Sequence, residues 1–294
     1  MNPLKELTKT TVSLGQETLT VITQPVPPMT MPRQAPEVPA GWEPAAPDFV
    51  GMGTARSGTT WWWSLLSQHS RYANNNSRKE LHFFDHYMGV EEVDPAAYYR
   101  YFPRPPGMVA GEWTPRYMYD FWTPPMLRRI APETKLLVLL RDPVQRLLSN
   151  LALIRGRQIS ISHSLLHQQY ERGLYGQQLH TLFQHFPPEQ VLVLQYEQCV
   201  QEPVAQMHKT LEFLQLDPAD WHPAKPPTDR VNASPVAKPE LSPATTDALE
   251  LAFQADLALA FELVPALDPA LWPTAARAGD VKRPKPASTP GPSR

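Results

Sequence analysis

The sequence predicts an α/β protein with a mostly parallel central sheet flanked by helices. Two runs of consecutive apolar residues, at 136–140 and within 190–196, are typical of strands buried on both faces of a parallel sheet. Segments with helical spacing of apolar residues alternate with these runs, and the chain has no internal repeat. This alternation favours a parallel sheet, because each parallel connection needs a crossover segment.

The first predicted element is a short strand that ends at Phe49 and Val50 and runs into the turn 51-GMGTARSGTT-60. The spacing of its glycines and hydroxyls is that of a P-loop, but Thr59 stands where a nucleotide hydrolase carries lysine. Arg56 is the cation of this turn. Backbone N–H groups, a helix N-terminus and hydroxyls can bind a phosphate here. The alternative is an ordinary turn with Arg56 in solvent.

The second predicted strand, 136–140, ends in Arg141 and leads into a helix with Pro143 in its first turn. Arg146 and Ser149 are three residues apart and therefore face the same way on that helix. A cation at the end of a strand and a hydroxyl on the next helix predict a second anion site. Two anion sites on one sheet indicate a ligand with two separated phosphates.

The remaining elements continue the alternation. The apolar spacing predicts a helix from Ser164 to Phe186, a strand at 190–196, a helix from Pro203 through Leu214, and a last helix from Leu241 to Leu263. No second domain is evident. The folded region is expected at 46–274. Because prolines cluster before it, 1–45 is expected to be largely disordered, with a lone strand or hairpin within 11–23, and 275–294 is expected to be a disordered tail.

Composition limits the possible partners and location. The 294 residues, 42% of them hydrophobic, suffice for one sizeable core, and the net charge of −2 gives no general attraction to nucleic acid or anionic membrane. The single cysteine, Cys199, cannot form an intrachain disulfide, which fits a reducing compartment. No apolar stretch reaches the length of a membrane span, and the first 15 residues are polar. We therefore expect a cytoplasmic protein without stable membrane insertion.

The two anion-site segments resemble the nucleotide-binding elements of the sulfotransferases that use 3′-phosphoadenosine 5′-phosphosulfate (PAPS). GTARSGTTW is similar to their 5′-phosphosulfate loop, and RDPVQRLLS to their 3′-phosphate motif RxPxxRxxS. The resemblance implies a P-loop-like sulfotransferase fold, PAPS as donor, 3′,5′-bisphosphoadenosine (PAP) as product, and no metal. By the same resemblance the donor-binding residues are Arg56, Ser57, Gly58, Thr59, Thr60, Trp61, Arg141, Ser149 and Arg230, with Arg56 also stabilising the leaving phosphate and Trp61 stacking on adenine.

The segment 78-RKELHFFDHY-87 resembles the KE-x-HFFD stretch of the carbohydrate and heparan sulfate sulfotransferases, the type closest in motif. The resemblance assigns the general base to Glu80 and neighbouring polar positions to His82 and Asp85. His82 is the reserve candidate, because the hormone and phenol sulfotransferases use a histidine. The alternative reading is that Glu80 pairs with Lys79 or Arg78 on the surface and that the phenylalanines are core.

The segment 111-GEWTPRYMYDFW-122 resembles the EKTPxY element of the same family, with one departure. Trp113 stands where the carbohydrate enzymes place an active-site lysine, which puts a heparan-like polyanionic acceptor in doubt. The aromatic residues of this segment either form an apolar acceptor pocket or belong to the core; they are Trp113, Tyr117, Tyr119, Phe121 and Trp122.

The predicted function is transfer of a sulfuryl group from PAPS to a hydroxyl of a small-molecule, lipid or saccharide acceptor. Two alternatives remain at this point. One is a P-loop nucleotide-dependent phosphotransferase, against which the missing lysine and the second anion motif argue. The other is a non-catalytic nucleotide-binding protein of the same fold, in which the base would be dispensable. The sequence leaves the acceptor and the oligomeric state open.

Overall fold

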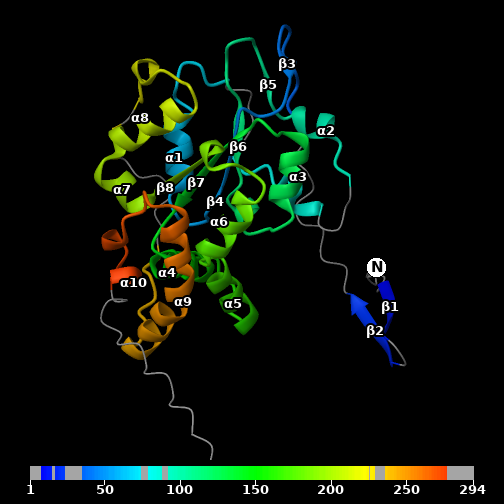
Figure 1. Cartoon of the computed structure of the whole chain (residues 1–294), viewed down its shortest axis with the longest axis vertical. Coiled ribbons are helices and arrows are strands. Elements are labelled where there is room, and N and C mark those ends of the chain that lie inside the picture. The colour runs from blue at the N-terminus through cyan, green and yellow to red at the C-terminus, as the bar shows by residue number, and fades with distance from the viewer. Residues whose placement is uncertain are drawn as a thin grey trace, which may run out of the picture.

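The structure is a computed structural model that describes residues 8–14, 17–23, 35–73, 79–87, 92–224, 226–228 and 236–276. Its centre is a four-stranded parallel sheet in the order β6 (Gly111–Trp113), β4 (Phe49–Gly53), β7 (Lys135–Leu140) and β8 (Val191–Gln195). The predicted mostly parallel sheet is therefore confirmed. Figure 1 shows these strands inside a shell of helices.

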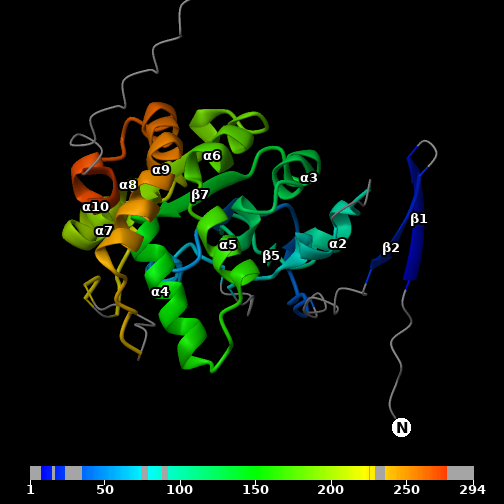
Figure 2. The ribbon, with the colours of Figure 1, turned by 90° about the horizontal axis from the view of Figure 1, so that it is seen from below.

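Two hydrophobic clusters cover the two faces of the sheet, and alternate residues of β4 and β7 belong to different clusters. Helices α3 (Thr123–Ile130), α6 (Tyr175–Phe183) and α9 (Pro243–Leu263) pack on one face, and α1 (Thr59–Leu66) and α8 (Pro203–Phe213) on the other. In Figure 2, α6 and α9 lie together on one side of β7. This two-sided burial explains why the strands read as continuous apolar runs.

The other elements are short or lie at the margins of the sheet. Strands β3 (Glu43–Pro44) and β5 (Pro103–Arg104) form a small antiparallel pair, and β1 (Thr8–Leu14) and β2 (Glu17–Thr23) form a hairpin, one of the two predicted options. The remaining helices are α2 (Pro95–Tyr99), α4 (Pro143–Gly156), α5 (His163–Glu171), α7 (Tyr196–Gln201), α10 (Pro273–Ala276) and the 3₁₀ turns η1 (Phe83–His86), η2 (Pro115–Met118), η3 (Pro188–Gln190), η4 (Pro218–Asp220) and η5 (Pro269–Leu271).

The predicted single helix from Ser164 to Phe186 is wrong. The segment forms two helices, α5 and α6, that are separated at residues 172–174. A Cβ atom at Gly173 would lie 2.8 Å from the ring of Phe253 on α9, so the break brings the backbone against this helix. Tertiary packing against α9 thus overrides the local helical pattern. The helices predicted from Pro203 and from Leu241 are confirmed as α8 and α9.

Across the part of the chain that the structure describes, none of the helices combines the length and the apolar character needed to traverse a bilayer.

Candidate active site

The turn after β4 is held to the neighbouring strand and caps helix α1. The backbone N–H of Thr54 donates to the carbonyl of Leu139 at 2.8 Å, and the hydroxyls of Thr54 and Ser57 are 2.6 Å apart. Gly58 is the N-cap of α1 with φ +86°, and a Cβ atom there would lie 2.8 Å from the ring of Tyr196. Both facts require glycine at this position. Thr59 and Thr60 form the first turn of α1, where backbone N–H groups lack intrahelical partners.

The structure brings the two predicted anion sites into contact. The Arg56 Nε donates to the Ser149 hydroxyl at 3.2 Å, and the Arg141 Nη1 donates to the Arg56 carbonyl at 3.2 Å. Strands β4 and β7 are neighbours, so the segments that follow them meet at the same edge of the sheet. The Arg141 guanidinium lies over the ring of Tyr196, 4.7 Å from its centroid. Its buried Nε has no hydrogen-bond partner among the described residues.

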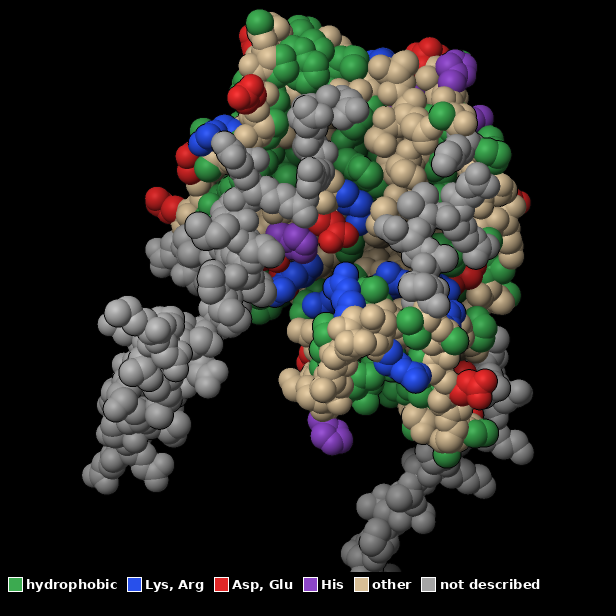
Figure 3. Space-filling model, turned by 180° about the vertical axis from the view of Figure 1, so that it is seen from behind, with side chains coloured by type: hydrophobic (Ala, Val, Ile, Leu, Met, Phe, Trp, Pro, Cys, Tyr) green, Lys and Arg blue, Asp and Glu red, His purple; other side chains and the backbone are tan. Residues whose placement is uncertain are grey.

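Two further cations, Arg157 and Lys238, join Arg56 and Arg141. Burial, then the charges of Arg141 and Arg157, lower the pKa of Arg56. Burial and the charge of Arg141 lower the pKa of Lys238, whose Nζ donates to Gln145 at 2.9 Å. None of the four cations forms an ion pair with a carboxylate within the described chain. Figure 3 shows Lys and Arg side chains gathered in a hollow on the face turned away in Figure 1. A group of neighbouring cations of this kind indicates a binding site for an anionic ligand.

Sequence reasoning missed both of these added cations. Arg157 lies eight residues after Ser149 at the end of α4, so the helical repeat could have found it on the same side of the helix. Lys238 lies outside every motif and had no local signal. Arg230 falls outside the described residues.

Three other residues of the predicted motifs lie in the interior. Trp61 is 2% exposed, and its Nε1 donates to the Pro227 carbonyl at 2.9 Å. Ser57 is fully buried, with its N–H bonded to Thr54. Arg146 is also fully buried and donates to the Gln169 carbonyl. Trp61 and Ser57 therefore support the turn, Arg146 supports the end of α5, and adenine stacking by Trp61 stays a prediction.

The loop that carries Glu80 and His82 is fixed by four successive backbone N–H groups. Those of residues 80, 81, 82 and 83 donate to the Trp113 carbonyl, the Glu112 carboxylate, the Thr114 hydroxyl and the Tyr117 hydroxyl. Glu112 is buried, and burial raises its pKa even though Thr114 and Tyr98 donate hydrogen bonds to it. Its role is to hold the loop.

The three predicted catalytic residues share a rare backbone conformation. Arg56, Glu80 and His82 have φ of +73°, +69° and +56°, and only two other non-glycine residues of the described chain, Gln158 and Gln215, have positive φ. Residues other than glycine pay a steric cost in this region, and such residues concentrate at functional sites. The observation is independent of the motif resemblance and supports a site at these positions.

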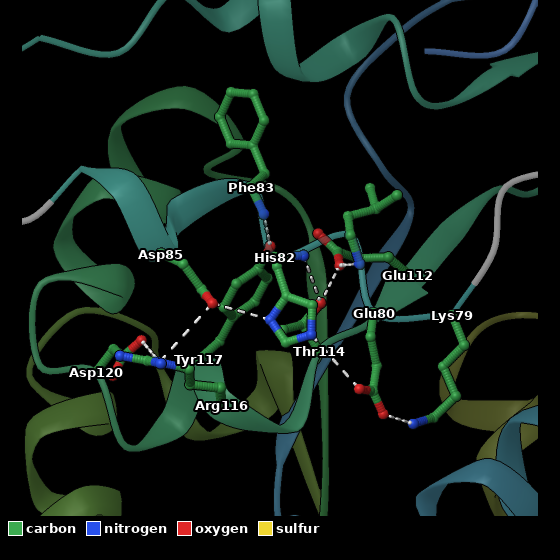
Figure 4. Close-up of polar contacts among 11 residues, drawn as sticks. Lys79, Glu80, His82, Phe83, Asp85, Glu112, Thr114, Arg116, Tyr117 and Asp120 are labelled. Atoms are coloured by element: carbon green, nitrogen blue, oxygen red, sulfur yellow. Dashed lines mark hydrogen bonds and ion pairs between the residues drawn. The ribbon is translucent and has the colours of Figure 1, made fainter. Parts of the chain in front are cut away.

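The charged side chains of this loop form a continuous chain of contacts (Figure 4). Glu80 lies 2.5 Å from Lys79 Nζ and 3.5 Å from His82 Nε2, and the His82 Nδ1 lies 2.9 Å from Asp85. Arg116 continues it, with its Nε 3.8 Å from Asp85 and 2.7 Å from Asp120. The predicted pairing of Glu80 with Lys79 is thus present, but Lys79 is largely buried, so this is not a surface pair.

The contacts within this chain shift the pKa values of Glu80 and His82 in opposite directions. Burial acts to raise the pKa of Glu80, but the hydrogen bond from His82 and the charge of Lys79 outweigh it and lower the pKa to about 2. Hydrogen bonds to Asp85 and Glu80 raise the pKa of His82 to about 9. At neutral pH Glu80 is therefore ionised and His82 is an imidazolium between two carboxylates.

The aromatic side chains of segment 113–122 lie partly in the hydrophobic core and partly along a cavity. Trp113 and Tyr117 are fully buried, and Trp113 packs so closely on Gly51 that a Cβ atom there would lie 2.1 Å from its ring. Tyr119, Phe121 and Trp122 line a cavity of about 480 Å³ between this segment and helices α5 and α6. Trp113 and Tyr117 therefore belong to the core, and the other three residues line a cavity; that this cavity receives the acceptor stays a prediction.

A family model described as a sulfotransferase domain matches residues 46–227, more than half of the chain. The chain belongs to the sulfotransferase family. A sulfotransferase from Alicyclobacillus acidocaldarius has a crystal structure that superposes with a TM-score of 0.60 at 25% identity, covering 77% of this chain and 99% of that one. The P-loop-like sulfotransferase fold is therefore confirmed.

Among curated relatives, this sulfotransferase is similar to heparan sulfate glucosamine 3-O-sulfotransferase 3B1 of Mus musculus, with 27% identity over 212 residues, 62% of this chain and 52% of that protein. It is also 36% identical over 103 residues to the membrane-associated sulfotransferase kil1 of Dictyostelium discoideum, which covers 35% of this chain and 22% of that protein. The chain spans about half the length of the heparan sulfate relatives that it matches.

Within the described part of the chain, no group of three or more His, Cys, Asp or Glu side chains is arranged to hold a metal ion.

Proposed function

We propose that the protein transfers a sulfuryl group from PAPS to a hydroxyl of its acceptor. The observation that carries this proposal is the group of four cations beside the turn that caps α1. Among the described residues these cations have no carboxylate partner, and the buried Nε of one of them, Arg141, has no hydrogen-bond partner. A donor with separated 3′- and 5′-phosphate groups supplies the negative charge that these cations lack. In this arrangement Arg141 and Ser149 bind the 3′-phosphate, and Arg56 and the first turn of α1 bind the 5′-phosphosulfate.

The reaction needs a base, in-line alignment and stabilisation of the leaving group. Glu80 takes the proton of the acceptor hydroxyl as the acceptor oxygen bonds to sulfur. The bond between sulfur and the bridging oxygen of the 5′-phosphate breaks, and PAP leaves with the bond's electron pair. Arg56 stabilises the charge that develops on this oxygen, because its planar guanidinium can hold two oxygens at once.

The pKa of about 2 makes Glu80 always available as a carboxylate but a weak proton acceptor. Binding of the donor strengthens it as a base. The donor brings negative charge toward Lys79 and His82, and nearby negative charge raises the pKa of a carboxylate. His82, protonated at neutral pH, then holds Glu80 in place as a positioning residue and is the reserve base only if it loses its proton.

A thermal-shift comparison tests the donor assignment. PAP should raise the melting temperature by mass action, 5′-AMP should raise it much less, and ATP with magnesium should resemble 5′-AMP. Arg56→Lys keeps the charge and should retain substantial activity, whereas Arg56→Ala should lose more in turnover than in PAP affinity. Stabilisation by ATP with magnesium that exceeds the effect of PAP would favour the phosphotransferase alternative.

The acceptor class and the location are part of the same proposal. The heparan sulfate relatives favour a saccharide among the three acceptor classes considered. The cytoplasmic location stays a prediction, and one relative is named a membrane-associated sulfotransferase. Activity without an added metal is likewise expected, and its loss on treatment with a chelator, restored by magnesium, would contradict it.

A further inference from the structure

The cavity between η2 and helices α5 and α6 is lined by Arg116 and Asp120, the last two residues in the chain of contacts that starts at Glu80. Arg116 lines this cavity and is also the residue that reaches Asp85 beside His82. The Trp122 Nε1 donates to the Phe84 carbonyl at 3.0 Å, which ties a second lining residue to the loop that carries the base. Glu80 and His82 do not themselves line the cavity, so an acceptor bound here extends along Asp85 and His82 to bring a hydroxyl to the candidate base.

The charges around the cavity compensate one another. Arg116 is paired with Asp120 and lies near Asp85, and the Arg172 guanidinium is held over the Tyr119 ring at 5.2 Å. Burial and the charge of Arg116 lower the pKa of Arg172, while Asp120 and Asp85 act to raise it, so two arginines lie among two aspartates. Glu171 adds a further negative charge to the lining. Among the described residues, a polyanionic acceptor would find no surplus positive charge around the cavity, in contrast to the donor side.

Two side chains of the lining carry buried acceptor oxygens that have no hydrogen-bond partner among the described residues. They are Asp120 Oδ1 and Gln178 Oε1. A buried acceptor without a donor is costly, and a ligand hydroxyl can supply the donor whereas sulfate or carboxylate oxygens cannot. The last torsion of a glutamine is soft, so the Gln178 oxygen can turn toward the cavity. Burial raises the pKa of Asp120 to about 6, which shows how weakly its charge is solvated.

The remaining lining suits a ring that carries hydroxyls. Phe121, which is 69% exposed, lines the cavity together with Trp122 and Tyr119, and the amides of Gln168 and Gln177 line it as well. Aromatic faces pack on the apolar face of a sugar ring, and amides both donate to and accept from its hydroxyls. The volume of about 480 Å³ lies within the range of small-ligand pockets.

We infer that this cavity is the acceptor subsite and that it takes an uncharged, hydroxyl-rich ring, such as the sugar of a neutral glycoside, rather than a sulfated polyanion. The inference rests on the proposed function and gives the acceptor of that reaction its chemical class.

The test uses the full chain saturated with PAP, and three probes: 4-nitrophenyl β-D-glucopyranoside, 4-nitrophenol, and a heparan sulfate oligosaccharide. Calorimetry measures binding, and transfer from radiolabelled PAPS measures activity. The glycoside should bind, and it should be sulfated with a kcat/KM roughly tenfold or more above that of the other two probes. Preference for the oligosaccharide, or equal use of 4-nitrophenol and the glycoside, would overturn the inference.

Variants locate the effect in the cavity. Phe121→Ala and Gln178→Ala should each raise KM and Kd for the glycoside by roughly three- to tenfold, with kcat and PAP affinity nearly unchanged. Leu251→Ala is the matched control, because Leu251 is 61% exposed on α9 away from the cavity lining, and it should change nothing. Unchanged KM and Kd in both cavity variants would overturn the inference. Loss of PAP binding by the wild-type protein would instead overturn the proposed function, so the two failures are distinguishable.

Discussion

The two charged regions of the site are built in opposite ways. On the donor side, Arg56 and Arg141 lie with two further cations and, within the described part of the chain, no carboxylate partner; their mutual repulsion is part of what lowers the pKa of Arg56. On the base side, Glu80, His82 and Asp85 alternate in sign with Lys79 and Arg116, so each charge is stabilised by the next. The donor side is therefore incomplete until an anion binds, whereas the base side is complete in itself. The donor side is thus suited to binding an anionic ligand, and the base side to accepting a proton.

The largest expected effect is on turnover, from a change on the base side. Glu80→Gln keeps the shape of the side chain but removes the proton acceptor, so kcat should fall by about 10²–10⁴-fold. PAP affinity should hardly change, because Glu80 is outside the cation group. Steady-state kinetics with radiolabelled PAPS and calorimetry with PAP measure the two quantities. Turnover that survives in Glu80→Gln and collapses in His82→Ala would show that the base was misassigned.

The next effect is on affinity, from a change on the donor side. Arg141→Ala removes a charge-assisted contact and should weaken PAP binding by about 1.5–3 kcal/mol. Binding of 5′-AMP should be nearly unaffected, because it lacks the 3′-phosphate. Arg155→Ala is the matched control, since Arg155 is an exposed arginine of the same strand–helix unit. Equal losses of affinity for PAP and 5′-AMP would contradict the assignment of Arg141 to the 3′-phosphate. The proposed contrast between the donor side and the base side would then fail as well.

A smaller effect concerns stability and its pH dependence on the base side. The folded-state pKa of His82 is about 9, above the ordinary 6.5, so its protonated form stabilises the fold. This stabilisation is fully present below about pH 6.5 and is lost as the pH rises through 9. His82→Gln should therefore lower the melting temperature by a few degrees at pH 6 and by much less at pH 10. A difference that is independent of pH would contradict the charged contact chain.

Glu80 should behave in the opposite sense at the acidic end. Its folded-state pKa is about 2, below the ordinary 4.5, so its contribution is present above pH 4.5 and is lost as the pH falls through 2. The base side should thus be most stable between these two transitions.

The smallest effect tests whether the donor side is unfavourable without its ligand. Lys238→Ala removes one exposed member of the cation group, so the ligand-free protein should be unchanged or stabilised by at most about 0.5 kcal/mol. PAP affinity should fall by roughly two- to fivefold, less than in Arg141→Ala. Chemical denaturation with and without PAP measures both effects. Clear destabilisation of the ligand-free protein would show that Lys238 is paired and that the two regions differ less than proposed.

Local sequence determined much of the fold and the chemistry of the site. The apolar runs of β7 and β8 predicted buried parallel strands because both faces of a parallel sheet are covered, a property that needs no knowledge of the partner elements. The turn around Arg56 and the segment after Arg141 were predicted as anion sites from local sequence, because phosphate sites depend on short stretches of backbone, and the structure brings the two segments into contact. The break between α5 and α6 escaped prediction, because it follows from packing against Phe253 some eighty positions away.

Only the tertiary structure decided which polar and aromatic residues meet. The sequence named Glu80 and His82, but the pKa values of both depend on burial and on hydrogen bonds to each other, to Lys79 and to Asp85, which the fold brings together. Likewise, Trp113 and Phe121 belong to one aromatic segment, yet one is fully buried and the other is 69% exposed beside a cavity. Residue types and local spacing fix which groups are available. Their distances and solvation depend on contacts between distant segments, and these distances and solvation set the charge of the base and the shape of the acceptor cavity.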